Sequence, residues 1–403
     1  MAIKLRTIAL LLPAICTALA AQSIPQPTSA STAATRDTSY IDAQGTAYVT
    51  RIVPVPLDLS PEARKSLIRT TPDQAPPESL EHRRAQMDLS AGRANAAWSK
   101  LCPNTITDST LAGVPVRIVN PSNLSSTNRD KVLINLHGGG FNADSGSYSE
   151  TIPIAGYTRI KVIAVLYRLA PEHPFPAGVD DAVAVYRELL KTYQPSHMVL
   201  YGTSAGAVLT AEVAVKLKSL RLPMPAALGI FSTLDRFDQE DDSQAIYTLQ
   251  GFSGHLDPPD DGIHDPYYVG SADPKDPVLS PIYADLHGLP PTLFLTSGRD
   301  ALLSGTANLH RAYLRAGVDA RLVLFDALPH AFWYDASLPE SIEATHIMAD
   351  FMLRQLENSL EHPCAQMQRR NSAVALPLKL SRDEQTRASQ SRTQGRDSEH
   401  SLW

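Results

Sequence analysis

The chain has 403 residues, of which 43% are hydrophobic and 19% charged, and its formal net charge at pH 7 is -6. This balance is typical of a globular protein with a large core, and it excludes a fibrous or wholly disordered chain. A weakly acidic chain lacks the positive electrostatic potential that attracts phosphate backbones, so we expect no nucleic acid partner.

Residues 1–20 have the features of a secretory signal peptide. Lys4 and Arg6 precede an apolar stretch from Ile8 to Leu19, which ends in a small-residue pattern at Ala20. The stretch is shorter than the roughly 20 consecutive apolar residues that a membrane span needs. We therefore expect cleavage near Ala20, a secreted or periplasmic protein, and no stable membrane span after cleavage.

Two polar segments flank the rest of the chain. Residues 21–40 are rich in Ser, Thr, Pro and Ala, which predicts a flexible leader, and residues 363–403 predict a disordered tail. Cleavage would leave Cys102 and Cys364 as the only thiols in an oxidising compartment. A disulfide between them and two free thiols both stay open, because a bridge requires close Cα atoms.

Residues 41–103 predict helices that precede the first strands. Ser60 is an N-cap candidate followed by Pro61 in the first turn, and a longer helical pattern runs from Pro77 to Trp98. A hairpin is expected next, with its two strands on either side of a turn that contains Gly113. These strands are Ile106–Asp108 and Val114–Val119.

Residues 104–362 predict one domain of the α/β class. Short apolar runs alternate with helical patterns, and runs this apolar suit strands that are buried on both faces. We expect a mostly parallel central sheet flanked by helices. Residues 235–276 break the alternation, being acidic and rich in Pro and Gly, and they predict an insertion of the kind that often covers a site. The apolar runs are Val132–Leu136, Val162–Leu166, Met198–Tyr201, Leu228–Phe231, Leu293–Thr296 and Leu322–Phe325, and the helical patterns include Val179–Tyr193 and Ala205–Leu217.

The segment Gly202–Gly206 has the sequence G-x-S-x-G between a predicted strand and a predicted helix. In that context the motif forms a sharp turn that exposes its serine as a nucleophile. Side chains at Gly202 or Gly206 would clash, because the turn brings these two positions close together. Ser204 is therefore the predicted nucleophile, and a glycine-rich turn without chemistry is the alternative.

The segment His137–Gly140 follows the predicted strand Val132–Leu136 and has the sequence H-G-G-G. Glycines let backbone N–H groups approach a developing oxyanion closely. We expect Gly138 and Gly139 to form an oxyanion hole, with the N–H of Ala205 as the third donor. A phosphate-binding loop is disfavoured, because no Lys-Ser or Lys-Thr pair follows. His137 is interpreted as a residue that shapes the loop.

A serine nucleophile needs a histidine base and an acid that orients it. Asp300 and His330 each follow a predicted strand, and Ser, Asp, His is a chain order in which such triads occur. Asp235 and Asp326 are the alternative acids. No group of residues has metal-ligand spacing such as H-E-x-x-H, so we expect no metal.

These motifs together resemble the hormone-sensitive-lipase-like family of α/β-hydrolases, including its bacterial esterases. The resemblance runs from about Thr105 to Leu356 and also includes the segment Tyr167–Ala177, Y-R-L-A-P-E-H-P-F-P-A. It implies a cap built from the N-terminal helices and the insertion, carboxylesterase activity on short to medium acyl chains, and no cofactor. It also implies a possible homodimer paired through the last strand, Arg321–Phe325. Thr203 departs from the common form of the motif, which has Asp there.

The expected function is hydrolysis of small-molecule carboxylic esters through an acyl-enzyme on Ser204, with His330 as base and then acid, and Asp300 fixing the imidazole. Two alternatives stay open. The same triad could act on lactones or sugar acetates, because specificity depends on the pocket. The fold could also bind a ligand without cleaving it.

Overall fold

The computed structural model describes residues 39–49, 53–68, 79–247 and 266–358. The predicted signal peptide, most of the leader, the predicted tail with Cys364, and residues 248–265 of the insertion lie outside the described residues. The chain divides into two compact units, residues 1–54 and 55–403. In the first unit, strands β1 (Tyr40–Ile41) and β2 (Ala47–Tyr48) form an antiparallel hairpin that the sequence analysis did not predict.

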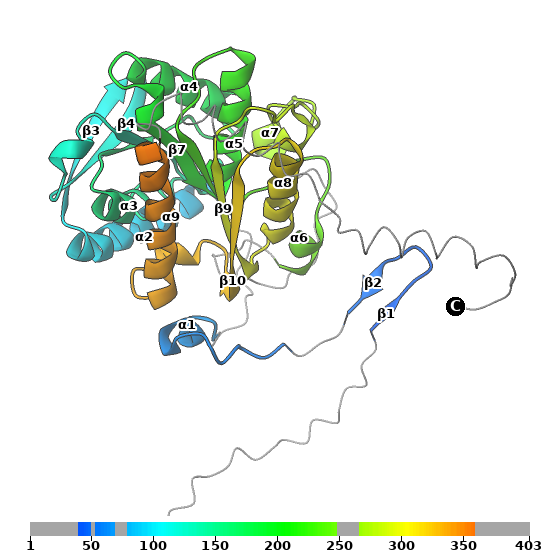
Figure 1. Ribbon diagram of the computed structural model, residues 1–403. Helices are drawn as coiled ribbons and strands as arrows, with labels where there is room; N and C mark the ends of the chain where they lie inside the picture. The colour runs from blue at the N-terminus through cyan, green and yellow to red at the C-terminus, as the bar shows by residue number, and fades with distance from the viewer. Residues whose placement is uncertain (1–38, 50–52, 69–78, 248–265, 359–403) are drawn as a thin grey trace, which may run out of the picture. The chain divides into compact units, whose positions relative to one another are not determined.

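An eight-stranded sheet forms the centre of the second unit (Figure 1), in the order β10-β9-β8-β7-β5-β6-β4-β3. Strands β3 and β4 pair antiparallel, as the predicted hairpin requires, and β4 is antiparallel to β6. All other pairs are parallel, which confirms the mostly parallel sheet. The strands are β3 (Asn104–Leu111), β4 (Val114–Pro121), β5 (Val132–Leu136), β6 (Val162–Val165), β7 (Met198–Thr203), β8 (Ala227–Phe231), β9 (Thr292–Arg299) and β10 (Ala320–Pro329).

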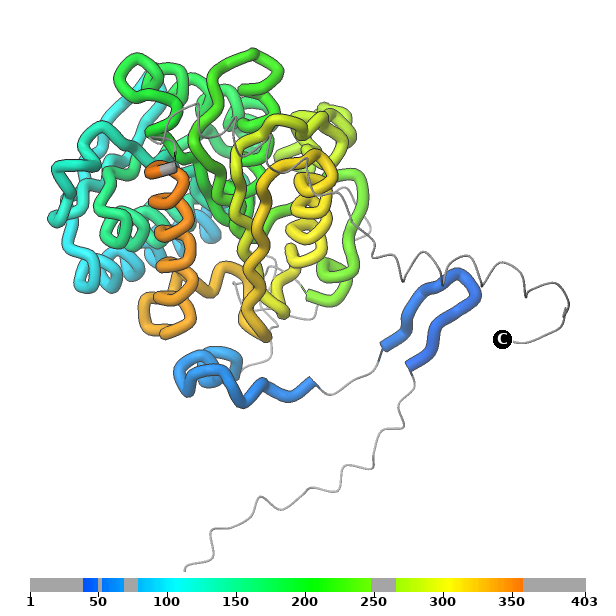
Figure 2. The backbone as a smooth tube through the Cα atoms, viewed as in Figure 1, coloured from blue at the N-terminus to red at the C-terminus, as the bar shows by residue number. Residues whose placement is uncertain are grey.

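Helices cover both faces of this sheet. One face carries the core that contains α4, α5 and α8, and the other carries the core that contains α2, α3 and α9. Figure 2 traces the chain from β10 into α9, which returns along the sheet. The helices are α1 (Pro61–Ser66), α2 (Leu80–Leu101), α3 (Thr151–Thr158), α4 (Ala177–Leu189), α5 (Ala205–Ser219), α6 (Asp242–Ile246), α7 (Pro266–Val269), α8 (Leu303–Arg315) and α9 (Pro339–Asn358).

Residues of the central strands alternate between the two cores. In β5, Leu133 packs into the α3 and α9 core, whereas Ile134 packs into the α4 and α5 core. Both positions are therefore buried, which is why most residues of the central strands are apolar. Strand β10 lies at the edge of the sheet, and its Leu324 is 54% exposed. The homodimer through this strand stays a prediction, which sedimentation velocity can test.

The N-terminal helices pack within the same compact unit as the sheet. The Ser60 hydroxyl caps α1 by accepting from the N–H of Ala63 at 3.0 Å, and it donates to Glu340 of α9 at 2.8 Å. The indole of Trp98 in α2 donates to the carbonyl oxygen of Tyr334 at 3.0 Å. The break between the two units therefore falls at Pro54, upstream of α1 and α2.

Two glycines let the chain pass from β7 into α5 against the end of β5. A Cβ atom at Gly202 would lie 2.3 Å from the carbonyl oxygen of Leu136, and one at Gly206 would lie 1.9 Å from the same atom. Real Cβ atoms do not approach an oxygen this closely, so any side chain at either position would push α5 and β7 away from β5.

We expect Gly206→Ala to destabilise the fold by about 1–3 kcal/mol, the usual cost of overpacking a core. Gly92→Ala is the matched control, because a Cβ there meets nothing within 4 Å in the interior of α2. Alanine raises helix propensity, so the control should gain about 0.5–1 kcal/mol. Urea unfolding followed by circular dichroism measures both changes. Equal stability of the two variants would contradict the close packing.

Candidate active site

Ser204 lies between β7 and α5 with a backbone that is rare for a residue with a side chain. Its φ is 60° and its ψ is -127°. Its N–H donates to the carbonyl oxygens of Phe231 and Ser232 at the end of β8, at 3.0 Å each. Such a conformation persists only where surrounding contacts hold it, and it is frequent at functional sites. Ser204 therefore has the backbone geometry that the G-x-S-x-G motif predicts.

Asp300 and His330 come together at the ends of β9 and β10. Nδ1 of His330 lies 2.9 Å from Oδ1 of Asp300, and both side chains are buried. Asp300 also accepts from the Thr296 hydroxyl at 3.0 Å. The alternative acids lie elsewhere: Asp235 pairs with Arg236 at 2.8 Å, and Asp326 is exposed. The geometry favours Asp300 as the partner of the histidine.

The environment of Asp300 keeps its carboxyl ionised. Burial alone would raise the pKa of this group, but the charge of His330 and hydrogen bonds from His330, Ser232 and the N–H of Leu302 outweigh burial. The pKa of Asp300 therefore lies below its ordinary value of 3.8. An ionised Asp300 can only accept hydrogen bonds, so it selects the tautomer of His330 that carries a proton on Nδ1.

Ser232 is a site residue that the sequence analysis missed. Its hydroxyl lies 2.8 Å from Nδ1 of His330, and it donates to Asp300. Its carbonyl oxygen accepts the N–H of Ser204 at 3.0 Å. Ser232 therefore joins Ser204 to the pair of His330 and Asp300. Ser232 directly follows the apolar run Leu228–Phe231, and the other predicted site residues also follow predicted strands. This position is the signal in the sequence that could have identified Ser232 as a site residue.

The loop His137–Gly140 follows β5 and contains two glycines with positive φ. Gly139 has a φ of 120°, and a Cβ there would lie 2.2 Å from the carbonyl oxygen of Ala143. Gly140 has a φ of 61°. The imidazole Nδ1–H of His137 donates to the carbonyl oxygen of Gly138 at 2.9 Å, and its ring stacks on Tyr167 at 4.2 Å. His137 shapes the loop, in agreement with the sequence interpretation.

The three predicted oxyanion donors differ in what their N–H groups contact. The N–H of Gly138 bonds the carboxyl of Glu150 and lowers the pKa of that group. Within the described ranges, no residue accepts a hydrogen bond from the N–H of Gly139, Gly140 or Ala205. An N–H directed at one acceptor is not available to a second, so this contact favours Gly139 and Gly140 as donors. The set predicted from the sequence, Gly138, Gly139 and Ala205, stays a prediction.

Helix α2 is attached to the oxyanion loop by two consecutive arginines. Nε of Arg83 donates to Oδ1 of Asn142 at 3.0 Å, and Nε of Arg84 donates to the carbonyl oxygen of Asn142 at 2.7 Å. The Arg84 guanidinium also forms two hydrogen bonds of 2.7 Å with Glu172. This helix, which the sequence predicts to belong to a cap, is thereby fixed beside the loop that follows Gly140.

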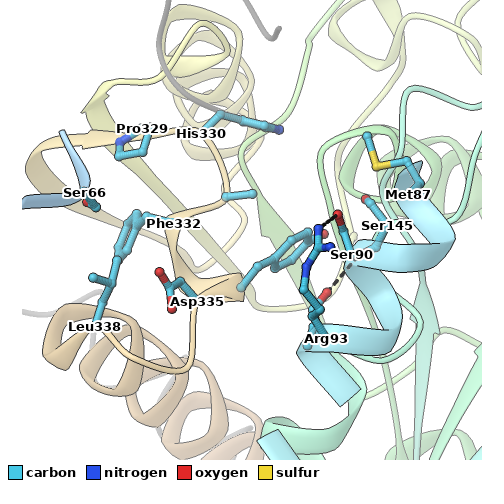
Figure 3. A pocket seen from close by; sticks show the side chains of 14 residues that line it. Ser66, Met87, Ser90, Arg93, Ser145, Pro329, His330, Phe332, Asp335 and Leu338 are labelled. Carbon is cyan, nitrogen blue, oxygen red and sulfur yellow. Dashed lines mark hydrogen bonds between the residues drawn. The ribbon is translucent and has the colours of Figure 1, made fainter. Parts of the chain in front are cut away.

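A pocket of about 490 Å³ lies next to His330 (Figure 3). One wall comes from α2, and the facing wall comes from the segment that follows β10. Both apolar and polar side chains line it, so it could hold a small organic group of mixed polarity. The lining residues are Ser66, Met87, Ser90, Arg93, Ala94, Ser145, Ser149, Pro329, His330, Ala331, Phe332, Tyr334, Asp335 and Leu338.

The described ranges contain no group of three or more His, Cys, Asp or Glu residues that could hold a metal ion. They also contain no helix with the length and hydropathy that crossing a bilayer requires. Cys102, at the end of α2, is buried with a free thiol, and burial raises its pKa. Its predicted alternative partner Cys364 lies outside these residues.

A mostly parallel eight-stranded sheet that carries these residues at the ends of its strands defines the α/β-hydrolase class. The family model for the alpha/beta hydrolase fold matches residues 133–334, which is half of the chain. The chain belongs to this family and, within it, to the hormone-sensitive-lipase-like carboxylic-ester hydrolases, as its relatives indicate.

Curated relatives and solved structures agree on this assignment. An acetyl-hydrolase of Streptomyces hygroscopicus is 33% identical over 229 residues, which are 55% of this chain and 75% of the relative. An esterase of Acinetobacter venetianus is 28% identical over 284 residues, 66% of this chain and 90% of the relative. The crystal structure of esterase E25 is 30% identical with a TM-score of 0.65, covering 76% of this chain and 98% of that one. An esterase of the bacterial hormone-sensitive lipase family is also 30% identical, with a TM-score of 0.62, covering 70% and 94%.

Proposed function

We propose that the protein is a serine carboxylesterase that hydrolyses small esters through an acyl-enzyme intermediate. The observation that carries the proposal is the contact between Asp300 and His330, joined through Ser232 to the strained backbone of Ser204. An acid, an imidazole and a serine in this order are the parts that acyl transfer needs. The naming of several relatives as esterases supports the same chemistry.

In the proposed mechanism, His330 takes the hydroxyl proton of Ser204 as that oxygen attacks the ester carbonyl. Asp300 accepts the Nδ1–H of the imidazole and stabilises the imidazolium that forms. His330 then donates the proton to the leaving alcohol, and water repeats the sequence to release the acid. The ionised state of Asp300 supports this role, because a protonated carboxyl would not stabilise an imidazolium.

The negative charge of the tetrahedral intermediate forms on the former carbonyl oxygen. We propose that the N–H groups of Gly139, Gly140 and Ala205 donate to it. The free state of these three groups within the described part of the chain supports the assignment, as does the start of α5 at Ala205. Backbone donors at a helix N-terminus act on developing negative charge without reorganisation, which makes them effective in acyl transfer.

Hydrolysis of p-nitrophenyl esters from acetate to palmitate should fall by about 10⁴-fold or more in kcat for Ser204→Ala and His330→Ala. Asp300→Asn should also lose activity, because an amide no longer selects the reactive tautomer. Ser337→Ala, an exposed serine near the site loop, is the control that should keep activity. A wild type as inactive as Ser204→Ala on every ester would favour a ligand-binding role or a substrate that is not an ester.

The pocket next to His330 is proposed to hold the acyl chain. Its volume of about 490 Å³ is in the range of small-ligand pockets and suits short to medium chains. The polar side chains in its wall, such as Ser90 and Asp335, also allow an acetylated sugar or a lactone. One relative is named an acetyl-hydrolase, which supports a substrate with a short acyl group.

A tryptophan in the wall of this pocket tests whether the acyl chain binds there. Ala94→Trp should fill part of it and move the preferred p-nitrophenyl ester toward shorter acyl chains, by raising KM for the longer esters. Ala96→Trp places the same side chain on an exposed position of α2 and should leave the preference unchanged. The preference is read from kcat/KM across the series. An unchanged preference in Ala94→Trp would place the acyl chain elsewhere.

We further propose that the protein is exported and that residues 1–20 are removed. The basic residues, the apolar stretch and the small residues before position 21 support this proposal. N-terminal sequencing of the protein recovered from the periplasm or the medium should begin near Ala21. Recovery of the full-length chain only from the cytosol would contradict export.

A further inference from the structure

Glu150 is a buried carboxyl that the proposed mechanism does not use. It lies at the start of α3, directly before Thr151, and is 4% exposed. Oε2 accepts from the side-chain amide of Asn135 at 3.0 Å, and Oε1 forms a short hydrogen bond with the hydroxyl of Tyr334. The N–H of Gly138 and the hydroxyl of Thr203 also bond this carboxyl.

The partners of Glu150 belong to the three chain segments that carry the proposed chemistry. Gly138 directly precedes the proposed oxyanion donors, Thr203 directly precedes Ser204, and Tyr334 follows His330 by four residues. The indole N–H of Trp333 also donates to the Thr203 hydroxyl, at 3.1 Å. One side chain therefore connects the ends of β5 and β7 with the segment that follows β10.

We propose that Glu150 is a positioning residue of the active site, which holds the oxyanion loop, the nucleophile turn and the histidine loop in their relative places. The proposal rests on the proposed esterase function. A carboxyl suits this place because its two oxygens can accept hydrogen bonds from several donors at once. The Gly146 backbone leaves it little room, because a Cβ there would lie 2.1 Å from Oε1.

The contact with Thr203 gives a reason for the departure of this motif from its common form. Aspartate at position 203 would place a second carboxylate beside Glu150 in a buried place. Two neighbouring carboxylates cannot both ionise cheaply there. The threonine hydroxyl instead donates to Glu150 and accepts from Trp333. Thr203 and Glu150 are therefore complementary, with the carboxyl supplied by the residue that precedes α3.

Glu150 also differs from Asp300 in its ionisation. Burial raises the pKa of Glu150 to about 8, although hydrogen bonds from Tyr334, Asn135, Thr203 and Gly138 favour the ionised form. The titratable groups that face it from neighbouring elements are Tyr167, Tyr201 and Tyr334, and burial raises the pKa of each well above 10. Since these tyrosines stay neutral, Glu150 is mostly neutral at pH 7 and ionises as the pH rises through 8.

Ionisation of Glu150 places a negative charge behind the loop where the oxyanion develops. Like charges repel more strongly in a buried place than in bulk water, so formation of the tetrahedral intermediate becomes less favourable. We therefore expect the kcat of the wild type to fall as the pH rises through about 8. Below that pH, the neutral carboxyl keeps its hydrogen bonds and adds no charge.

The experiment compares Glu150→Gln and Glu150→Ala by kcat and KM on p-nitrophenyl butyrate from pH 6 to pH 10. Glutamine has the shape of the neutral carboxyl but cannot ionise, so this variant should keep kcat near wild type at pH 7 and lose the alkaline fall. Alanine removes every contact, and kcat should fall about 100-fold with little change in KM, because small misplacements of catalytic groups are costly.

Two further variants keep the test specific. Glu212 is another buried glutamate, which lies on α5 and accepts a hydrogen bond from the Tyr268 hydroxyl at 2.6 Å. The Glu212→Gln variant should keep the alkaline fall in kcat. Tyr334→Phe removes a donor that lowers the pKa of Glu150. Its alkaline fall should therefore move to higher pH.

Thermal unfolding shows which variants are folded. If Glu150→Ala does not fold, the pH profiles of Glu150→Gln and Tyr334→Phe still decide the question. An alkaline fall in Glu150→Gln that matches the wild type, or a folded Glu150→Ala with unchanged kcat, would overturn the positioning role. A wild type without hydrolysis that depends on Ser204 would instead overturn the proposed function itself.

Discussion

The carbonyl oxygen of Leu136 occupies the space where side chains at positions 202 and 206 would otherwise lie. This close packing of β5 against the turn between β7 and α5 sets the distance between two functional loops. The oxyanion loop continues from Leu136, and Ser204 lies in the turn. Without two glycines the loops could not approach, and the N–H groups proposed to bind the oxyanion would lie too far from the serine.

The parallel sheet brings the other residues to the same edge. Five strands, β5, β7, β8, β9 and β10, end beside one another, and each is followed by a residue of the candidate site. These residues are His137, Ser204, Ser232, Asp300 and His330. Crossover connections return every parallel strand to the same direction, so residues about 190 positions apart meet at one edge of the sheet.

Two buried carboxyls in this site are stabilised in opposite ways. Asp300 contacts the ring of His330, and that interaction holds its pKa below the ordinary value despite burial. Glu150 has hydroxyl, amide and backbone partners that carry no charge, and burial raises its pKa to about 8. The presence or absence of a charged neighbour therefore decides the state of each at neutral pH. An ionised Asp300 can stabilise an imidazolium, whereas a neutral Glu150 can hold a loop without opposing an oxyanion.

The sequence by itself determined the class of fold and the residues proposed for chemistry. Apolar runs at regular intervals predict buried parallel strands, and G-x-S-x-G and H-G-G-G place functional residues at strand ends, because these are local patterns. Local patterns favoured Asp300 but left Asp235 and Asp326 open as alternatives, and they could not reveal the contacts of Ser232 and Glu150. Only the tertiary structure decided these points, because each depends on contacts between segments far apart in the chain, whose distances no short stretch of sequence encodes.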